Sequence, residues 1–145
     1  MNLKSLMVLA LLSYALSVNA EATTLAEWIG KYPSDKISGT TANEVLMKSH
    51  LLKKILPASE IKLIKLLTTE DLISKNSDYI IVSKCKPHAC PSNHSMTIEK
   101  SSSELWVGIY QNNGETVSTR WYGTSEYTDI PPSIQKLFIR GHIPE

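Results

Sequence analysis

The chain has 145 residues, with 15 Lys and Arg against 14 Asp and Glu, so its formal net charge at pH 7 is +1. A nearly neutral chain gives no electrostatic case for binding nucleic acid or a membrane surface. The length, with 42% hydrophobic residues, suits one domain with its own core.

The first twenty residues have the pattern of a secretory signal peptide. Lys4 precedes an apolar run over residues 6–16, and Val18-Asn19-Ala20 is a small-residue cleavage pattern. The run is too short to span a membrane, which takes about 20 apolar residues. We therefore expect residues 1–20 to be a cleaved leader and residues 21–145 to be one neutral domain that is exported to an oxidising compartment. In such a compartment a cysteine pair persists as a disulfide.

The first part of the mature domain is predicted to be helical. Two Thr-x-x-Glu pairs have the spacing of a capping box, Thr24 with Glu27 and Thr41 with Glu44. After the second pair, apolar residues recur at helical spacing, which predicts one long helix that ends at Pro57. A further helix is predicted over residues 58–67.

Beyond residue 67 the pattern changes to short strands. The polar stretch 68–78 is predicted to be a loop, with Glu70-Asp71 as a solvated acidic pair. Asn113-Gly114 predicts a hairpin, because this pair accepts the positive φ angles of tight turns. A turn is predicted at Ser101-Ser102-Ser103. The strands are predicted over residues 79–83, 94–100, 105–110 and 116–122.

Pro131-Pro132 precedes a final helix, predicted over residues 133–138 with Ile134, Leu137 and Phe138 on one face. Helices, then an antiparallel meander, then a helix make an α+β domain. The strand aromatics are predicted to lie in the core or on a sheet face, with one or two left as interface anchors. They are Trp106, Tyr110, Trp121 and Tyr122.

The only two cysteines enclose the segment Cys85-Lys86-Pro87-His88-Ala89-Cys90, which we call the cassette. Closing this loop as a disulfide removes roughly 2 kcal/mol of unfolded-state freedom. Pro87 fixes its own φ and restricts Lys86, so the loop is pre-organised. Lys84 and Lys86 flank His88, and the complement of such a tip is a narrow cleft lined by carboxylates, as in glycoside-cleaving enzymes.

Other interpretations of the cassette stay open on the residues alone. On spacing alone, the favoured interpretation is a disulfide that only stabilises a hairpin, with His88 exposed to solvent. Cys85, His88, Cys90 and His94 could ligate a metal in an exported metal-binding protein, although the spacing matches none of the usual zinc patterns. A catalytic redox pair has two intervening residues, whereas this pair has four. No nucleophile–base arrangement is evident, so nothing predicts an enzyme.

Three features together resemble the Ivy family: the cassette after a β-branched strand, the Trp-containing hairpin and the later Trp121-Tyr122-Gly123. Members of this family are proteins of the bacterial periplasm that inhibit vertebrate (c-type) lysozyme, so the resemblance implies a periplasmic location. The resemblance implies an antiparallel meander packed between helices, in α/β/α layers. It also implies that the loop closed by Cys85 and Cys90 inserts His88 into the lysozyme cleft, where the catalytic glutamate and aspartate lie. Lys86 and Pro87 match the family motif.

The resemblance thus predicts that Lys86, Pro87, His88 and Ala89 bind the target enzyme, with no cofactor or metal. A c-type lysozyme is the expected partner. A bacterial lytic transglycosylase or a muramidase toxin is the alternative, for which the protein would be a regulator or an immunity protein; a homodimer stays open. Ala89 departs from the family, which usually has an aspartate there. That aspartate could orient the imidazole or accept N–H bonds in the loop, so Ala89 predicts a less supported tip.

Overall fold

The computed structural model describes residues 24–101 and 104–140, and these form a six-stranded antiparallel sheet beside a small two-stranded ladder. The strand order in the sheet is β3-β5-β6-β7-β8, and β4 pairs with β5. The strands of the sheet are β3 (Thr69–Glu70), β4 (Ser74–Asn76), β5 (Tyr79–Cys85), β6 (Asn93–Ser101), β7 (Glu104–Asn112) and β8 (Val117–Tyr122). The ladder pairs β1 (Lys36–Ile37) with β2 (Thr40–Thr41). Strands β5 to β8 are the predicted meander, which is confirmed.

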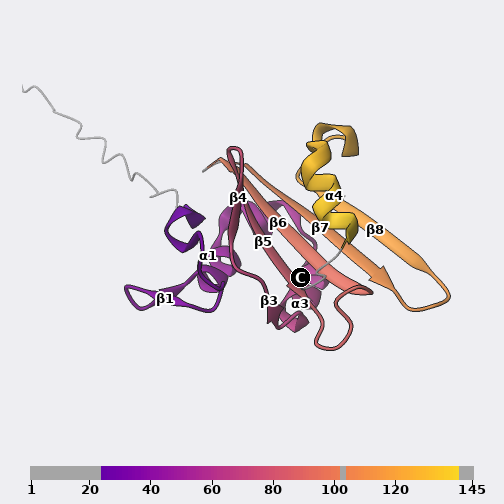
Figure 1. The fold of residues 1–145 in the computed structure, drawn as a ribbon, viewed down its shortest axis with the longest axis horizontal. Coiled ribbons are helices and arrows are strands. Elements are labelled where there is room, and N and C mark those ends of the chain that lie inside the picture. The colour runs from indigo at the N-terminus through magenta and orange to yellow at the C-terminus, as the bar shows by residue number, and fades with distance from the viewer. Residues whose placement is uncertain (1–23, 102–103, 141–145) are drawn as a thin grey trace, which may run out of the picture.

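Helices cover both faces of the sheet (Figure 1). On one face lie η1 (Leu25–Trp28), α1 (Ala42–Lys48), α2 (His50–Ile55) and α3 (Ala58–Leu66), and on the other lies α4 (Pro132–Arg140), preceded by η2 (Tyr127–Asp129). The alternation of strand side chains explains the two layers: Ile98 and Trp106 pack against α4, whereas Val107 and Ile109 pack on the opposite side. The α+β prediction, with the meander between helices, is confirmed.

Helix α4 can lie close to the sheet because position 108 has no side chain. A Cβ atom at Gly108 would lie 2.8 Å from atoms of both Phe138 and Trp121. Phe138 and Ile134 fill this interface and are 2% and 0% exposed. The close approach brings the last turn of α4 against β6 and β7.

The predicted long helix is wrong, because it is broken at Ser49. The Ser49 N–H donates to the Leu46 carbonyl and ends α1, while its Oγ accepts the Leu52 N–H and caps α2. The capping box of Thr41 and Glu44 is confirmed at the start of α1. At the first Thr-x-x-Glu pair, Thr24 caps the short 3₁₀-helix η1.

Between α3 and β5 the structure also departs from the prediction. The stretch 68–78 is not only loop, because it contains β3 and β4, each set by pairing with β5. Leu137 is 41% exposed rather than buried beside Ile134. The Asn-Gly hairpin is confirmed, with Gly114 at φ 90°. The predicted leader 1–20 and residues 102–103 of the predicted serine turn lie outside the described residues.

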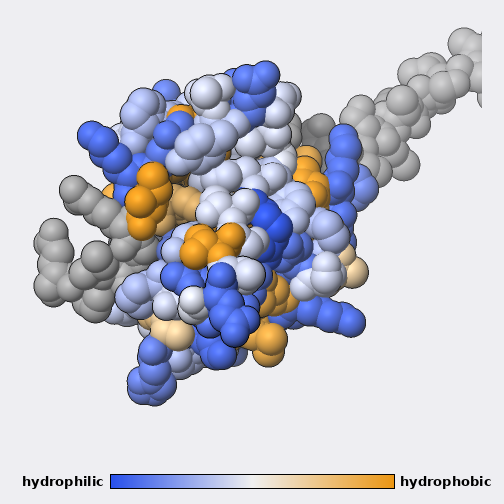
Figure 2. Space-filling view, turned by 90° about the vertical axis from the view of Figure 1, so that its right-hand side faces the viewer, coloured by the Kyte–Doolittle hydropathy of each residue, from blue (hydrophilic) through white to orange (hydrophobic). Residues whose placement is uncertain are grey.

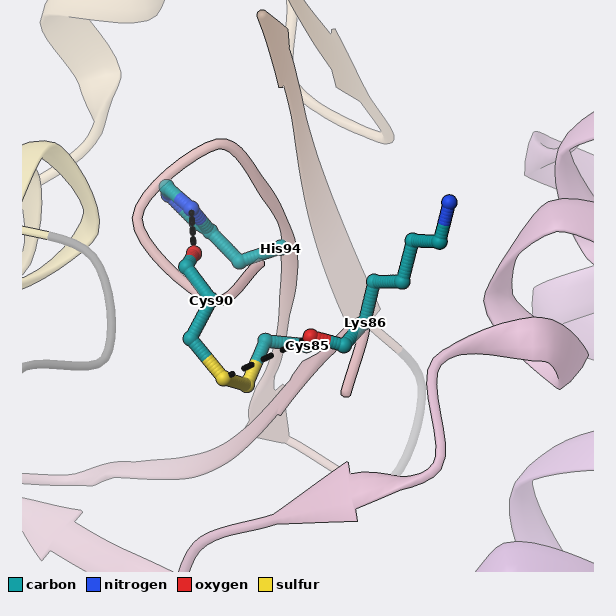
Figure 3. Close-up of a disulfide and its surroundings, with 4 residues drawn as sticks. All are labelled: Cys85, Lys86, Cys90 and His94. Atoms are coloured by element: carbon teal, nitrogen blue, oxygen red, sulfur yellow. Dashed lines mark hydrogen bonds between the residues drawn. A yellow bond between two sulfur atoms is a disulfide. The ribbon is translucent and has the colours of Figure 1, made fainter. Parts of the chain in front are cut away.

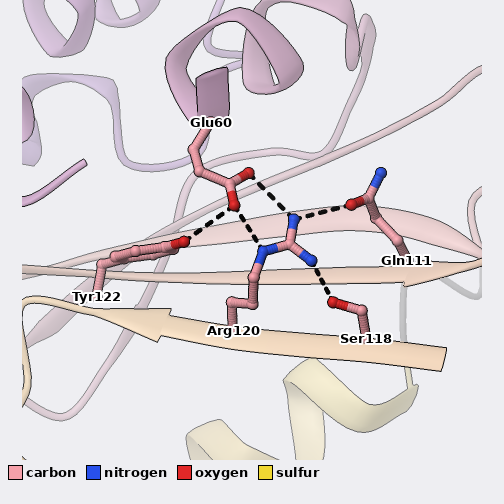
Figure 4. Close-up of polar contacts among 5 residues, drawn as sticks. All are labelled: Glu60, Gln111, Ser118, Arg120 and Tyr122. Carbon is pink, nitrogen blue, oxygen red and sulfur yellow. Dashed lines mark hydrogen bonds and ion pairs between the residues drawn. The ribbon is translucent and has the colours of Figure 1, made fainter. Parts of the chain in front are cut away.

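A polar cluster clamps α3 to strands β7 and β8 (Figure 4). Arg120 donates from Nε to Glu60 Oε1 at 2.6 Å and from Nη2 to Glu60 Oε2 at 3.1 Å. Tyr122 donates to the same carboxylate at 2.9 Å, and Gln111 and Ser118 accept from the guanidinium. These hydrogen bonds from Arg120 lower the pKa of Glu60 below its ordinary value.

None of the helices that the structure describes has the length and hydrophobicity of a membrane-spanning segment.

Candidate functional site

The cassette occupies the loop from β5 to β6, which projects beyond the end of the sheet (Figure 1). Cys85 is the last residue of β5 and is only 1% exposed. A disulfide joins it to Cys90, with the two Cα atoms 4.8 Å apart (Figure 3). The predicted disulfide is therefore confirmed, and it ties the exposed loop to a residue buried in the sheet.

The tip of the loop is a four-residue turn from Lys86 to Ala89. The Ala89 N–H donates to the Lys86 carbonyl at 3.0 Å. Pro87 takes the second position of the turn and His88 the third, with a φ of 61°. A proline followed by a residue of positive φ is the signature of a type II turn, and histidine enters the left-handed region more readily than most residues with a Cβ. Lys86, Pro87 and His88 are all exposed, so the turn presents them to solvent.

Ala89 is half-buried, and its backbone holds the turn. Its carbonyl accepts the N–H groups of Ser92 at 3.0 Å and Asn93 at 2.8 Å. Loop N–H groups of this kind are what an aspartate side chain at position 89 was expected to accept. Closure of the turn therefore rests on backbone bonds that do not require a polar side chain at position 89.

The base of the loop is tied to the neighbouring strands. The Lys86 N–H donates to the Asn93 carbonyl at 2.9 Å, which continues the β5–β6 pairing by one step. The Asn112 N–H, at the end of β7, donates to the Ser92 carbonyl at 2.7 Å. The Cys90 Sγ lies 3.7 Å from the Lys86 carbonyl oxygen, a packing contact because a disulfide sulfur carries no hydrogen. Both ends of the loop are thus fixed to the sheet.

His94 lies beneath the loop rather than on its surface. It is 5% exposed, and its ring packs between Tyr110 and Phe138 at centroid distances of 4.9 and 5.1 Å. Its Nδ1 lies 3.1 Å from the Cys90 carbonyl oxygen and its Nε2 lies 2.9 Å from the Phe138 carbonyl oxygen. The two sulfurs are bonded to each other and His94 is held by carbonyls, so this geometry does not support the four-ligand metal site. No group of three or more His, Cys, Asp or Glu among the described residues could hold a metal.

Lys84 does not flank the tip as predicted. It points toward α1, where its Nζ lies 3.6 Å from Glu70 and donates to Asn43 Oδ1 at 3.2 Å. Burial lowers the pKa of Lys84, and the Glu70 charge partly offsets this. Glu70 is correspondingly not a solvated loop residue, since its side chain is 11% exposed and lies on β3. The charged group beside His88 is therefore Lys86.

The strand aromatics have the predicted packing roles. Trp106 is 3% exposed, and Tyr110 and Trp121 pack against the same core cluster as partly buried residues. Tyr122 packs against the cluster on the opposite face. Tyr110 is tied to the loop only indirectly, through its stacking on His94. None of the four is an exposed anchor at the loop.

A family model described as inhibitor of vertebrate lysozyme (Ivy) matches residues 50–140. The chain belongs to the Ivy family. The match runs from α2 to α4 and so contains the cassette, the whole six-stranded sheet and the helix that packs on it. Comparison with curated proteins and with solved structures finds no match. Ivy proteins are inhibitors rather than enzymes, and vertebrate lysozyme is the partner that membership in the family indicates.

Proposed function

We propose that this Ivy protein is an exported inhibitor of c-type lysozyme that places the His88 side chain in the active-site cleft of the enzyme. The observation that carries the proposal is the conformation of the tip. His88 is exposed at the third position of a turn that is closed by a disulfide and by backbone hydrogen bonds. A turn of four residues is narrow enough to enter a cleft that a flat protein surface would only cover.

The chemistry of the tip suits a cleft with two carboxyl groups. An imidazole donates from one nitrogen and accepts at the other, and once protonated it donates from both, so it can bind a carboxylic acid and a carboxylate at once. The neighbouring Lys86 adds a positive charge that is complementary to an acidic cleft. Because the turn is held in place before binding, little conformational entropy is lost when it enters the cleft.

Outside the loop, the exposed large hydrophobic residues that the structure describes are scattered over the fold. In Figure 2 the hydrophobic side chains of the face shown form small separate patches among polar ones. The exposed large hydrophobic residues lie on several different elements, among them Leu66 on α3, Val117 on β8 and Ile139 on α4. This distribution supports recognition through a projecting loop.

The proposal is tested by titrating a c-type lysozyme with the parent protein and with His88→Ala. The expected loss is about 2 kcal/mol, or roughly 30-fold in the inhibition constant, which is a typical hot-spot cost. His50→Ala is the matched control, because His50 is also exposed but lies on α2, outside the loop. It should inhibit as the parent does. Normal inhibition by a folded His88→Ala protein would rule out the proposed contact.

The same titration against a bacterial lytic transglycosylase tests the alternative target. Inhibition of the lysozyme alone supports the proposal. If only the transglycosylase is inhibited, the protein is instead a regulator of an endogenous enzyme, and it would use the same tip for that role. Export is tested by sequencing the N-terminus of the periplasmic protein, which we expect to begin at Glu21.

A further inference from the structure

We propose that His94 is a positioning residue, which orients the His88 tip by donating a hydrogen bond from Nδ1 to the Cys90 carbonyl. The proposal builds on the inhibitory role of the tip described above. His94 itself is 5% exposed, so it cannot touch a target enzyme and acts only through the loop.

The imidazole is held in one orientation. Tyr110 stacks on one face of the ring at an interplanar angle of 20°, and Phe138 packs edge-on at 68°. In this orientation Nδ1 is directed at the Cys90 carbonyl oxygen, 3.1 Å away (Figure 3). The ring is therefore a fixed support for the peptide group that follows the cassette.

That peptide group needs a support besides the disulfide. A disulfide fixes the separation of Cys85 and Cys90, but rotations about the bonds of the cross-link leave the direction of the Cys90 carbonyl open. Cys90 lies two residues after His88, so rotation of its peptide group would tilt the tip relative to the sheet. The bond to His94 restricts that rotation.

The second nitrogen ties the same ring to α4. Nε2 lies 2.9 Å from the carbonyl oxygen of Phe138, which lies on α4. Both neighbours of the ring are acceptors. A neutral imidazole has one N–H and can donate to only one of them, whereas an imidazolium donates to both. His94 is thus shared between the loop and the helix, and the two roles can be separated by substitution.

Two substitutions divide the roles of His94. In His94→Asn the amide nitrogen takes the place of Nδ1 and can still donate to the Cys90 carbonyl. In His94→Gln the amide nitrogen takes the place of Nε2 and can still donate to the Phe138 carbonyl. Both variants remove the ring from its packing against Tyr110 and Phe138, so each controls for the loss of core packing in the other.

Two measurements are made on both variants. Amide hydrogen exchange of Ala89 and Asn93 reports on the loop without any target enzyme, and we expect it to be about tenfold or more faster in His94→Gln than in His94→Asn. Exchange at Val107, in the centre of β7, should be equal in the two. Inhibition of c-type lysozyme should be weakened about tenfold in His94→Gln and less than about threefold in His94→Asn.

Equal exchange at the loop amides in the two variants would overturn the positioning role. So would faster loop exchange that is matched by faster exchange at Val107, since that indicates only lost stability. If the loop amides respond as expected but the parent protein does not inhibit lysozyme, the proposed function fails and the role of His94 in fixing the loop stands.

Discussion

Removal of the disulfide distinguishes a pre-organised tip from an ordinary loop. The double variant Cys85→Ala, Cys90→Ala opens a loop of six residues, which costs about 2 kcal/mol of unfolding free energy in the chain-entropy model. Alanine is the suitable replacement because Cys85 is 1% exposed, and a serine there would bury a hydroxyl group. Loss of the buried sulfur adds about 1 kcal/mol. The expected total is about 3 kcal/mol.

Urea unfolding followed by tryptophan fluorescence measures this cost. The midpoint should fall and the m-value should rise slightly, because an unfolded chain without the cross-link exposes more surface. Inhibition of c-type lysozyme is then measured in buffer, where the variant is still folded, and should be weakened about tenfold or more because the tip must be ordered on binding. Parent protein whose disulfide has been reduced is the control: its inhibition should be weakened as in the variant, whereas its unfolding free energy should fall by only about 2 kcal/mol because both sulfurs remain. A folded variant that inhibits as well as the parent would refute the claim that closure of the loop prepares the tip.

Three further predictions concern the scaffold. Arg120 lowers the pKa of Glu60 from its ordinary 4.5, so the contribution of this pair to the free energy of unfolding is complete above pH 4.5 and is lost as the pH falls through the lowered pKa. In urea unfolding at a series of pH values, the fall in unfolding free energy at acid pH should be smaller for Glu60→Gln than for the parent. Glu99, on β6, is 6% exposed, and this burial raises its pKa. The parent should therefore lose unfolding free energy relative to Glu99→Gln as the pH rises from 4.5 through the raised pKa, and an unchanged difference would contradict this. Gly108→Ala should lower the free energy of unfolding by about 1–3 kcal/mol through its clash with Phe138, measured by thermal unfolding.

Local sequence signals predicted the elements whose cause is local. The capping box of Thr41 and Glu44, the start of α3 just after Pro57 and the Asn-Gly hairpin each depend on residues a few positions apart, and each is present. The helix break at Ser49 is also local, since serine is a strong N-cap residue. Its signal was hidden by apolar positions that continue the helical period on both sides. By contrast, β3 and β4 have two and three residues, and only their pairing with β5 makes them strands.

The candidate site likewise has features with a local cause and features that depend on residues distant in the chain. A tight loop closed by Cys85 and Cys90 could be predicted, because Pro87 and the cysteine spacing act within six residues. The buried supports could not, because their partners are distant in the chain. His94 meets the carbonyl of Phe138, 44 residues away, and that pairing exists only once α4 lies on the sheet.

The charged pairs were hidden for the same reason. Glu60 meets Arg120 across 60 residues, when α3 packs over β8. Lys84 reaches Asn43, 41 residues away, and pairs with Glu70 on the neighbouring strand. Each of these side chains is of a type that usually lies on the solvated surface, and only the packing of distant elements against one another partly buries it.

The most direct test of the central claim is a double-mutant cycle across the complex. His88→Ala is combined with a lysozyme whose catalytic glutamate is replaced by glutamine, and all four affinities are measured by calorimetry, so that enzyme activity is not needed. If the imidazole contacts that carboxyl group, we expect a coupling energy of about 1 kcal/mol or more, so that His88→Ala costs much less against the altered enzyme. An equal cost against both enzymes would show that His88 does not meet the catalytic glutamate.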